Sequence, residues 1–181
     1  VDFDGDGRRD VISSVPDLIA STANNLKKDG WAPGQTWGYE VVVPATLDFR
    51  LAGKAHTMSL AEWQRLGVAR PHGLAFAHPN EQAFLLVPAG IQGPGFLMLR
   101  NFRVIMRYNP AEAYALAIGH LADRLRGGGA FVQHWPRYEP VLTRADRLRL
   151  QQELDQHGFD VGEPDGRLGA RTREAVRETE E

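Results

Sequence analysis

The sequence opens on a run of alternating acidic residues, VDFDGDGRRD. Asp2, Asp4 and Asp6 occupy the first, third and fifth places of a pattern typical of calcium-binding loops, in which oxygens from alternate residues converge on one hard cation. Gly5 and Gly7 beside them permit the sharp turn that such a loop needs. The spacing therefore predicts a calcium site at the start of the chain.

The later positions of this loop depart from the standard calcium-binding pattern. The seventh residue, Arg8, would bind through its main-chain carbonyl, and Asp10 would bind directly or through water. The twelfth residue is Ser13, which cannot supply the usual bidentate carboxylate, so we expect a lengthened loop that brings Asp17 back to the ion. The alternative is an acidic surface loop without metal, but three close carboxylates would repel one another without a cation.

A second group of residues that could bind a ligand lies in RYNPAEAYALAIGH. Tyr108 and Asn109 are expected at a junction between a strand and a helix, with Tyr114 about one and a half turns into that helix. Aromatic and amide side chains at such a place can stack on a sugar ring and hydrogen-bond to it. The alternative is purely structural, with Asn109 as a helix cap and the tyrosines in the core. His120 is expected to pack in the core, because the histidines show no spacing typical of a metal site.

Hydrophobic periodicity and capping residues outline the elements around these two groups. Pro16 suits the first turn of a helix that follows the acidic loop, and Gly30 ends that helix. Further patterns predict strands at residues 39–43 and within residues 81–90 and 95–100, and helices over about residues 60–66, from 110 to 126, over 144–156 and from 170. This mixture predicts an α+β fold.

The composition is that of a globular protein, with 43% of the 181 residues hydrophobic and 24% charged. The net charge of −2 gives no electrostatic argument for binding nucleic acid or an anionic membrane. The chain has no cysteine, which excludes disulfides and thiolate metal sites, and no apolar run long enough to span a bilayer. Composition and charge therefore leave the two local groups of residues as the indications of function.

The character of the sequence changes near residue 135. Residues 1–135 hold the strands and most of the helices, a proline-punctuated stretch at 136–142 is expected to be a linker, and residues 143–181 are expected to form a small helical module. Thr143 and Asp146 have the spacing of a capping box at the start of this module. The chain begins directly in the acidic loop without a methionine, so we expect it to be a piece of a longer protein.

Three stretches, taken in order, resemble the membrane-bound lytic murein transglycosylases of the B type. The segment from VDFDGDGRRD to ASTANNLKKDGW looks like that family's calcium loop and following helix, and GPGFLMLRNFRVIMRYNPAEAYALAIGHLADRL looks like the last part of its catalytic domain. The segment LQQELDQHGFDVGEPDGRLGARTREAV is similar to a peptidoglycan-binding module. The resemblance implies an α+β fold made of the C-terminal part of a lysozyme-like catalytic domain, followed by a small helical peptidoglycan-binding module.

The resemblance also implies an activity. Enzymes of this family cleave the β-1,4 bond between N-acetylmuramic acid (MurNAc) and N-acetylglucosamine (GlcNAc) without adding water, and leave a 1,6-anhydro ring on the muramyl product. One glutamate acts as acid and then as base, and in the family it lies upstream of the calcium loop. No glutamate of this chain stands in the matching context, so we expect no catalytic residue within it and no activity from the chain alone.

The family's motif positions assign roles to the two groups of residues. By this resemblance Tyr108 and Tyr114 would line sugar subsites, and Asn109 would hydrogen-bond near the scissile bond. The elongated spacing of the acidic loop is also the family's, which supports Asp17 as a ligand of a structural calcium ion. The implied partner is the glycan strand of peptidoglycan, in the periplasm or cell envelope of a bacterium. Only a lipid anchor upstream would connect the protein to a membrane.

Two other functions remain open at the level of sequence. A non-catalytic, calcium-stabilised wall-binding protein would use the loop to hold the fold and the module to anchor it. A dockerin-like interaction module is disfavoured, because only one aspartate loop is present rather than a duplicated pair. A helix carrying glutamate and serine upstream of the acidic loop would favour the enzyme.

Overall fold

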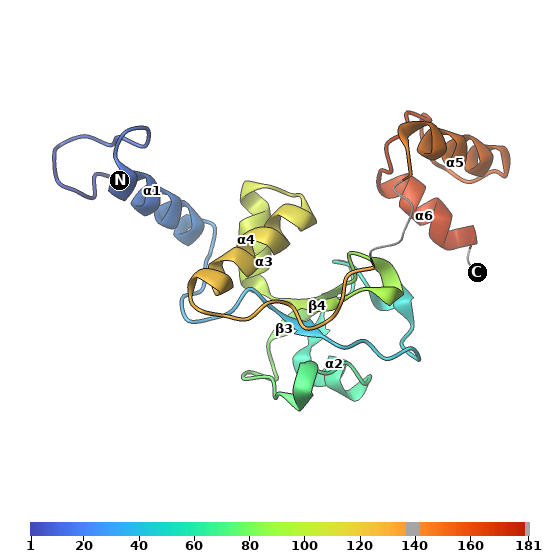
Figure 1. Cartoon of the computed structure of the whole chain (residues 1–181), viewed down its shortest axis with the longest axis horizontal. Helices are drawn as coiled ribbons and strands as arrows, with labels where there is room; N and C mark the ends of the chain where they lie inside the picture. The colour runs from blue at the N-terminus through green and yellow to red at the C-terminus, as the bar shows by residue number, and fades with distance from the viewer. Residues whose placement is uncertain (137–141, 180–181) are drawn as a thin grey trace. The chain divides into compact units, whose positions relative to one another are not determined.

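The computed structural model describes residues 1–136 and 142–179. The chain divides into two units, Val1–Pro136 and Arg137–Glu181, and Figure 1 colours it from blue at the N-terminus to red at the C-terminus. Each unit has a hydrophobic core of its own. The linker predicted at 136–142 falls largely on residues 137–141, which lie outside the described residues.

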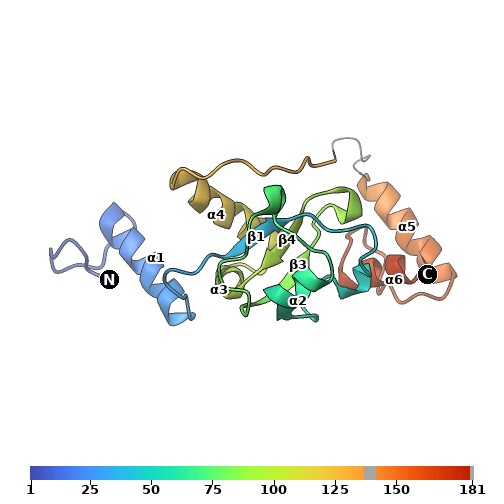
Figure 2. The same ribbon diagram turned by 90° about the horizontal axis from the view of Figure 1, so that it is seen from below.

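The first unit is built on an antiparallel sheet. Within the described residues its strands are β1 (Gly38–Val41), β2 (Met58–Ser59), β3 (Gln82–Leu86) and β4 (Gly95–Met98), in the spatial order β1-β4-β3-β2. Tyr39 lies opposite Leu97, and Phe84 lies opposite Met98. The strand β1 therefore forms one edge of the sheet, and β4 lies inside it (Figure 2).

Helices cover both faces of this sheet (Figure 1). The helices of the unit are α1 (Val15–Lys28), α2 (Leu60–Arg65), α3 (Arg100–Tyr108) and α4 (Glu112–Leu125). Successive side chains of a strand point to opposite faces, so Phe96 and Met98 of β4 pack with Phe102 of α3. Leu97 points to the other face and packs with Trp63 of α2. Because these β4 side chains are fully buried, β4 is the centre of the core.

The helix predicted after the acidic loop is confirmed as α1. Ser14 caps its N-terminus, Pro16 lies in its first turn, and Gly30 follows its C-terminus with a φ of 91°. The connection from α1 to the sheet is fixed by Asn101, a fully buried residue of α3. Asn101 accepts a hydrogen bond from Ala32 N–H (2.8 Å) and donates one to the Ala32 carbonyl (2.9 Å).

The expectation that Tyr108 and Asn109 lie between a strand and a helix is wrong. The preceding stretch is helix α3, so these residues lie at a junction between two helices. The β-branched and aromatic residues of this stretch favour a strand locally. However, Phe102 and Ile105 lie three positions apart on one face of the helix and are buried against the sheet, and this burial decides the outcome.

Strand β1 is shorter than predicted. It spans Gly38–Val41, whereas the pattern predicted a strand over residues 39–43. Val42 and Ala69 exchange two main-chain hydrogen bonds, of 2.7 and 3.2 Å, as an isolated antiparallel bridge. Part of the outer edge of the β1 segment is therefore paired with a loop instead of with another strand.

The second unit is a small helical module. It contains α5 (Arg144–Gln156) and α6 (Ala170–Thr179), and Thr143 and Asp146 form the predicted capping box at the start of α5. Its apolar core consists of Leu154, Val161 and Ala175. Across the described residues of both units, no helix combines the length and the apolar character that a membrane crossing requires.

Candidate functional site

The acidic loop brings three carboxylates together. One oxygen from each of Asp2, Asp4 and Asp6 lies within 4.8 Å of the others. Asp2 accepts hydrogen bonds from the N–H groups of Gly5 (2.8 Å) and Gly7 (3.0 Å). Both glycines have a positive φ, of 79° and 85°, which glycine adopts without strain. This set of oxygen donors fits a hard divalent cation such as calcium.

Asp17 lies outside this group of three carboxylates. It is buried in the first turn of α1, where Oδ1 accepts a hydrogen bond from Phe3 N–H (2.6 Å) and Oδ2 accepts one from Asp10 N–H (3.0 Å). Asp17 therefore ties two points of the acidic loop to α1. Arg8 donates its N–H to Asp6 (2.8 Å). The roles of Asp17 and of the Arg8 carbonyl as metal ligands stay predictions.

The acid stability of this loop follows from Asp17. The hydrogen bond from Phe3 N–H, with a smaller contribution from Asp10 N–H, holds the pKa of Asp17 below its usual value. Its ionised form is thus favoured by folding, so its contribution to stability is present above about pH 4 and is lost as the pH falls through the lowered pKa. In buffer with chelator, Asp17→Asn should therefore show a weaker loss of the α1 amide NMR signals on acidification than the unaltered chain. Superimposable acid profiles of the two proteins would contradict this role.

An exposed pair of tyrosines lies between α3 and α4. The ring centroids of Tyr108 and Tyr114 are 6.3 Å apart, with an angle of 29° between the ring planes. Tyr108 is 69% exposed and Tyr114 is 36% exposed, so the alternative that they pack in the core is wrong. Two neighbouring aromatic rings open to solvent are suited to stacking on sugar rings.

Asn109 connects the two helices beside this pair. Its Oδ1 accepts a hydrogen bond from the N–H of Ala111, the residue that precedes α4 (3.0 Å). Within the described residues, its Nδ2 group forms no hydrogen bond to the protein. The amide therefore combines a structural role in the turn with a donor that is available to a ligand.

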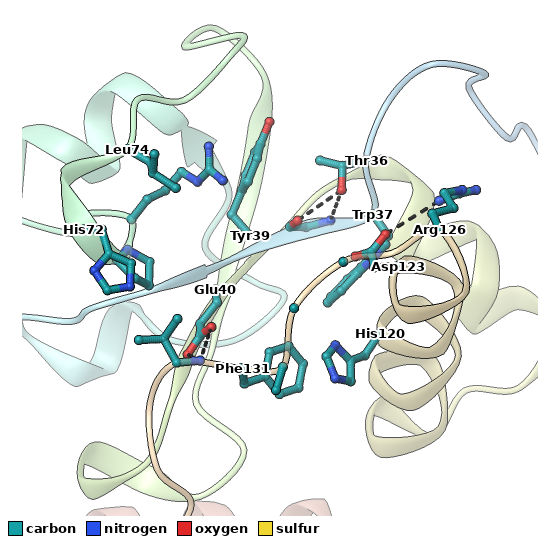
Figure 3. Close-up of a pocket in the computed structure, with 17 residues that line it drawn as sticks. Thr36, Trp37, Tyr39, Glu40, His72, Leu74, His120, Asp123, Arg126 and Phe131 are labelled. Atoms are coloured by element: carbon teal, nitrogen blue, oxygen red, sulfur yellow. Dashed lines mark hydrogen bonds and ion pairs between the residues drawn. The ribbon is translucent and has the colours of Figure 1, made fainter.

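A pocket of about 530 Å³ opens along β1 (Figure 3). It is lined by residues 36–40, by the turn at 70–74, by the C-terminal end of α4 and by the segment 128–132. Trp37 Nε1 donates a hydrogen bond to Asp123 (2.7 Å) and so connects the β1 side to α4. His120 lines this pocket, half-buried, and its ring stacks on Phe131 with centroids 3.8 Å apart.

Glu40 holds the segment that follows α4. Its carboxylate accepts hydrogen bonds from the N–H groups of Val132 (2.9 Å) and Gln133 (2.7 Å), and Phe131 packs edge-on against Phe96 of β4. This pocket and the hydrogen bonds that Glu40 accepts from the segment after α4 were not predicted from the sequence. The hydrogen-bond partners are 92 and 93 residues apart, and no local pattern connects a strand to a segment so distant.

Each of the two units matches a known protein family. The model of the transglycosylase SLT domain matches residues 1–123, and that of a putative peptidoglycan-binding domain matches residues 143–180. Because the first match covers more than half of the chain, the chain belongs to the transglycosylase SLT domain family. A comparison with curated proteins found no match.

The chain is also similar to several solved structures of lytic transglycosylases. SltB3 from Pseudomonas aeruginosa, in complex with NAG-NAM-pentapeptide, is 49% identical, with a TM-score of 0.91 over 99% of this chain and 49% of that chain. SltB3 in complex with NAG-anhNAM-pentapeptide is 50% identical, with a TM-score of 0.89 over 98% of this chain and 48% of that chain. Escherichia coli Slt35 in complex with calcium is 30% identical, with a TM-score of 0.55 over 70% of this chain and 39% of that chain.

These matches identify the architecture. The first unit has the lysozyme-like fold of SLT transglycosylases, and the second is a helical peptidoglycan-binding module. The chain spans about half the length of the SltB3 chain.

Proposed function

We propose that this chain is the glycan-binding part of a peptidoglycan lytic transglycosylase. The observation that carries the proposal is the exposed Tyr108–Tyr114 pair with Asn109 beside it, in a chain 49% identical to SltB3. SltB3 has been crystallised with NAG-NAM-pentapeptide and with NAG-anhNAM-pentapeptide. In this chain the tyrosine rings would stack on sugar rings, and Nδ2 of Asn109 would donate a hydrogen bond near the scissile bond.

The complete enzyme would cleave the β-1,4 bond between MurNAc and GlcNAc and form 1,6-anhydro-MurNAc, in the periplasm or cell envelope of a bacterium. A glutamate upstream of this chain would protonate the leaving oxygen and then accept the proton of the muramyl 6-hydroxyl as the ring closes. Two glutamates within this chain have structural partners instead, since Glu40 binds main-chain N–H groups and Glu62 caps α2. The chain alone would therefore bind glycan without cleaving it.

A structural calcium ion would stabilise the acidic loop in front of α1. Asp2, Asp4 and Asp6 would supply side-chain oxygens, Arg8 its carbonyl, and Asp17 a further carboxylate. The convergence of three carboxylates within 4.8 Å supports this site, as does the calcium complex of Slt35, which is 30% identical to this chain. The ion would neutralise the clustered charge and fix the loop on the helix.

Clearing of purified peptidoglycan tests whether this chain binds glycan while cleavage requires the part of the protein upstream of it. A suspension treated with the full-length protein should lose turbidity, because the upstream glutamate and the glycan-binding residues are then present together. The 181-residue chain alone should bind the sacculi in a sedimentation assay and leave the turbidity unchanged. Clearing by the isolated chain, or no clearing by the full-length protein, would contradict the proposal.

A further inference from the structure

The edge strand β1 has main-chain groups that point away from the sheet. Leu99 N–H donates a hydrogen bond to the Trp37 carbonyl (2.9 Å). Because main-chain groups alternate in direction along a strand, the N–H and carbonyl groups of the odd-numbered residues of this segment are directed toward β4. The even-numbered residues consequently bond outward, as Val42 does when it exchanges two hydrogen bonds with Ala69. The next even-numbered residue along this edge is Glu40.

The pairing along this outer edge stops before it reaches Glu40. Continuing the register from Val42 and Ala69 would place Pro71 opposite Glu40, but proline has no N–H to donate. The chain turns away there, in a 3-10 turn in which His72 has a φ of 58°. Within the described residues, the main-chain N–H and carbonyl of Glu40 are therefore left without a protein partner.

The pocket lies along this unpaired stretch of edge, and two of its lining residues, Arg70 and Arg126, can donate hydrogen bonds to an anionic group of a ligand. Both acidic side chains of the lining have protein partners: Glu40 accepts from main-chain N–H groups, and Asp123 accepts from Trp37 and pairs with Arg126. Arg126 lies 3.6 Å from Asp123 with 71% of its side chain exposed, and the guanidinium of Arg70 lies over the Tyr39 ring. Arg70 donates one N–H to the Ala75 carbonyl (2.8 Å) and Arg126 pairs with Asp123, but a guanidinium has five N–H donors, so both arginines keep donors for a ligand.

We propose that an extended peptide with a free carboxylate binds in this pocket as an added strand on β1. Its main chain would exchange hydrogen bonds with the N–H and carbonyl of Glu40, in the way that peptides extend exposed sheet edges in other proteins. Its carboxylate would pair with Arg126. The peptide would be the peptide arm of a muropeptide whose sugar rings contact Tyr108 and Tyr114. The choice of this ligand rests on the proposed function.

The position of the pocket relative to the tyrosine pair is compatible with one ligand spanning both. Tyr114 is near the start of α4, whereas Asp123 and Arg126 are at its end. At about 1.5 Å per residue, the helix separates Tyr114 from Asp123 by about 14 Å. Sugar and peptide would therefore contact opposite ends of the same helix.

Amide hydrogen exchange of the 181-residue chain tests the proposal, with three probes: a free pentapeptide, the NAG-NAM disaccharide without peptide, and NAG-NAM-pentapeptide. The free pentapeptide and NAG-NAM-pentapeptide should slow exchange at the Glu40 amide at least tenfold. Exchange at Tyr39 and Val41, which already face β4, should not change. The disaccharide alone should shift the NMR signals of Tyr108 and Tyr114 and leave the Glu40 amide unaffected.

Substitution of the carboxylate partner supplies a second readout. Arg126→Gln should weaken binding of the free pentapeptide about tenfold, the size expected for one lost charge-assisted hydrogen bond. Arg65→Gln removes the same charge from the end of α2, outside the pocket, and should leave binding unchanged. Binding of NAG-NAM-pentapeptide without protection at Glu40, or equal loss in both variants, would overturn the peptide site and leave the proposed glycan function standing. Protection by the free pentapeptide without any response to the sugars would instead overturn the glycan function alone.

Discussion

Replacing Tyr108 and Tyr114 together by alanine is expected to lower kcat/KM of the full-length protein on peptidoglycan by about a hundredfold. Covering one aromatic ring with a ligand contributes on the order of 1.5 kcal/mol or more, which is about tenfold in affinity for each ring. The rings are 69% and 36% exposed, so their removal should change the free energy of unfolding little. Initial rates of muropeptide release from purified peptidoglycan measure this loss.

Phenylalanine at the same positions is the matched control for the tyrosine pair. Tyr108→Phe and Tyr114→Phe keep both ring faces and remove only the hydroxyl groups, so most of the activity should remain. Full activity in the double alanine variant would contradict a role for the pair in binding sugar. An equal loss of kcat/KM in the alanine and phenylalanine variants would show that the hydroxyl groups, and not ring stacking, account for the effect.

Removing calcium is expected to destabilise the acidic loop and α1. A ligand held only by the folded state at a hundredfold excess over its Kd stabilises that state by about 2.7 kcal/mol. For a domain of this size, such a change corresponds to a shift of about 5 to 10 °C in the unfolding midpoint. The α1 amide signals of residues 15–28, followed on heating with calcium and with chelator, measure the shift. Identical midpoints in the two buffers would contradict a calcium site.

Asp4→Asn separates metal binding from general charge effects. The substitution removes one of the three converging carboxylates and should lower calcium affinity at least tenfold by titration calorimetry. Asp155→Asn removes the same charge from α5, in the second unit, and should leave calcium affinity unchanged. Equal effects of the two substitutions would show that the loop only attracts cations through its overall charge.

Local signals in the sequence predicted several elements correctly. Pro16 lies in the first turn of α1 and Thr143 caps α5 where the patterns placed them, because both signals act within the first turn of their own helix. The grouping of Asp2, Asp4 and Asp6 was predictable for the same reason, since it arises within five residues.

Features that depend on the sheet could not be predicted in this way. The β-branched and aromatic residues of α3 favour a strand locally, and burial of Phe102 and Ile105 against the sheet decides for a helix. The pocket depends on Glu40 bonding to Val132, 92 residues away, and on Pro71 interrupting the register beside β1. These contacts exist only once the chain has folded.

Mass spectrometry of the sugars released from purified peptidoglycan by the full-length protein distinguishes ring closure from hydrolysis. We expect muropeptides that end in 1,6-anhydro-MurNAc, each one water lighter than the corresponding hydrolysis product, because the muramyl 6-hydroxyl closes the ring in place of water. Products that end only in reducing MurNAc would contradict it, as would intact glycan after prolonged incubation.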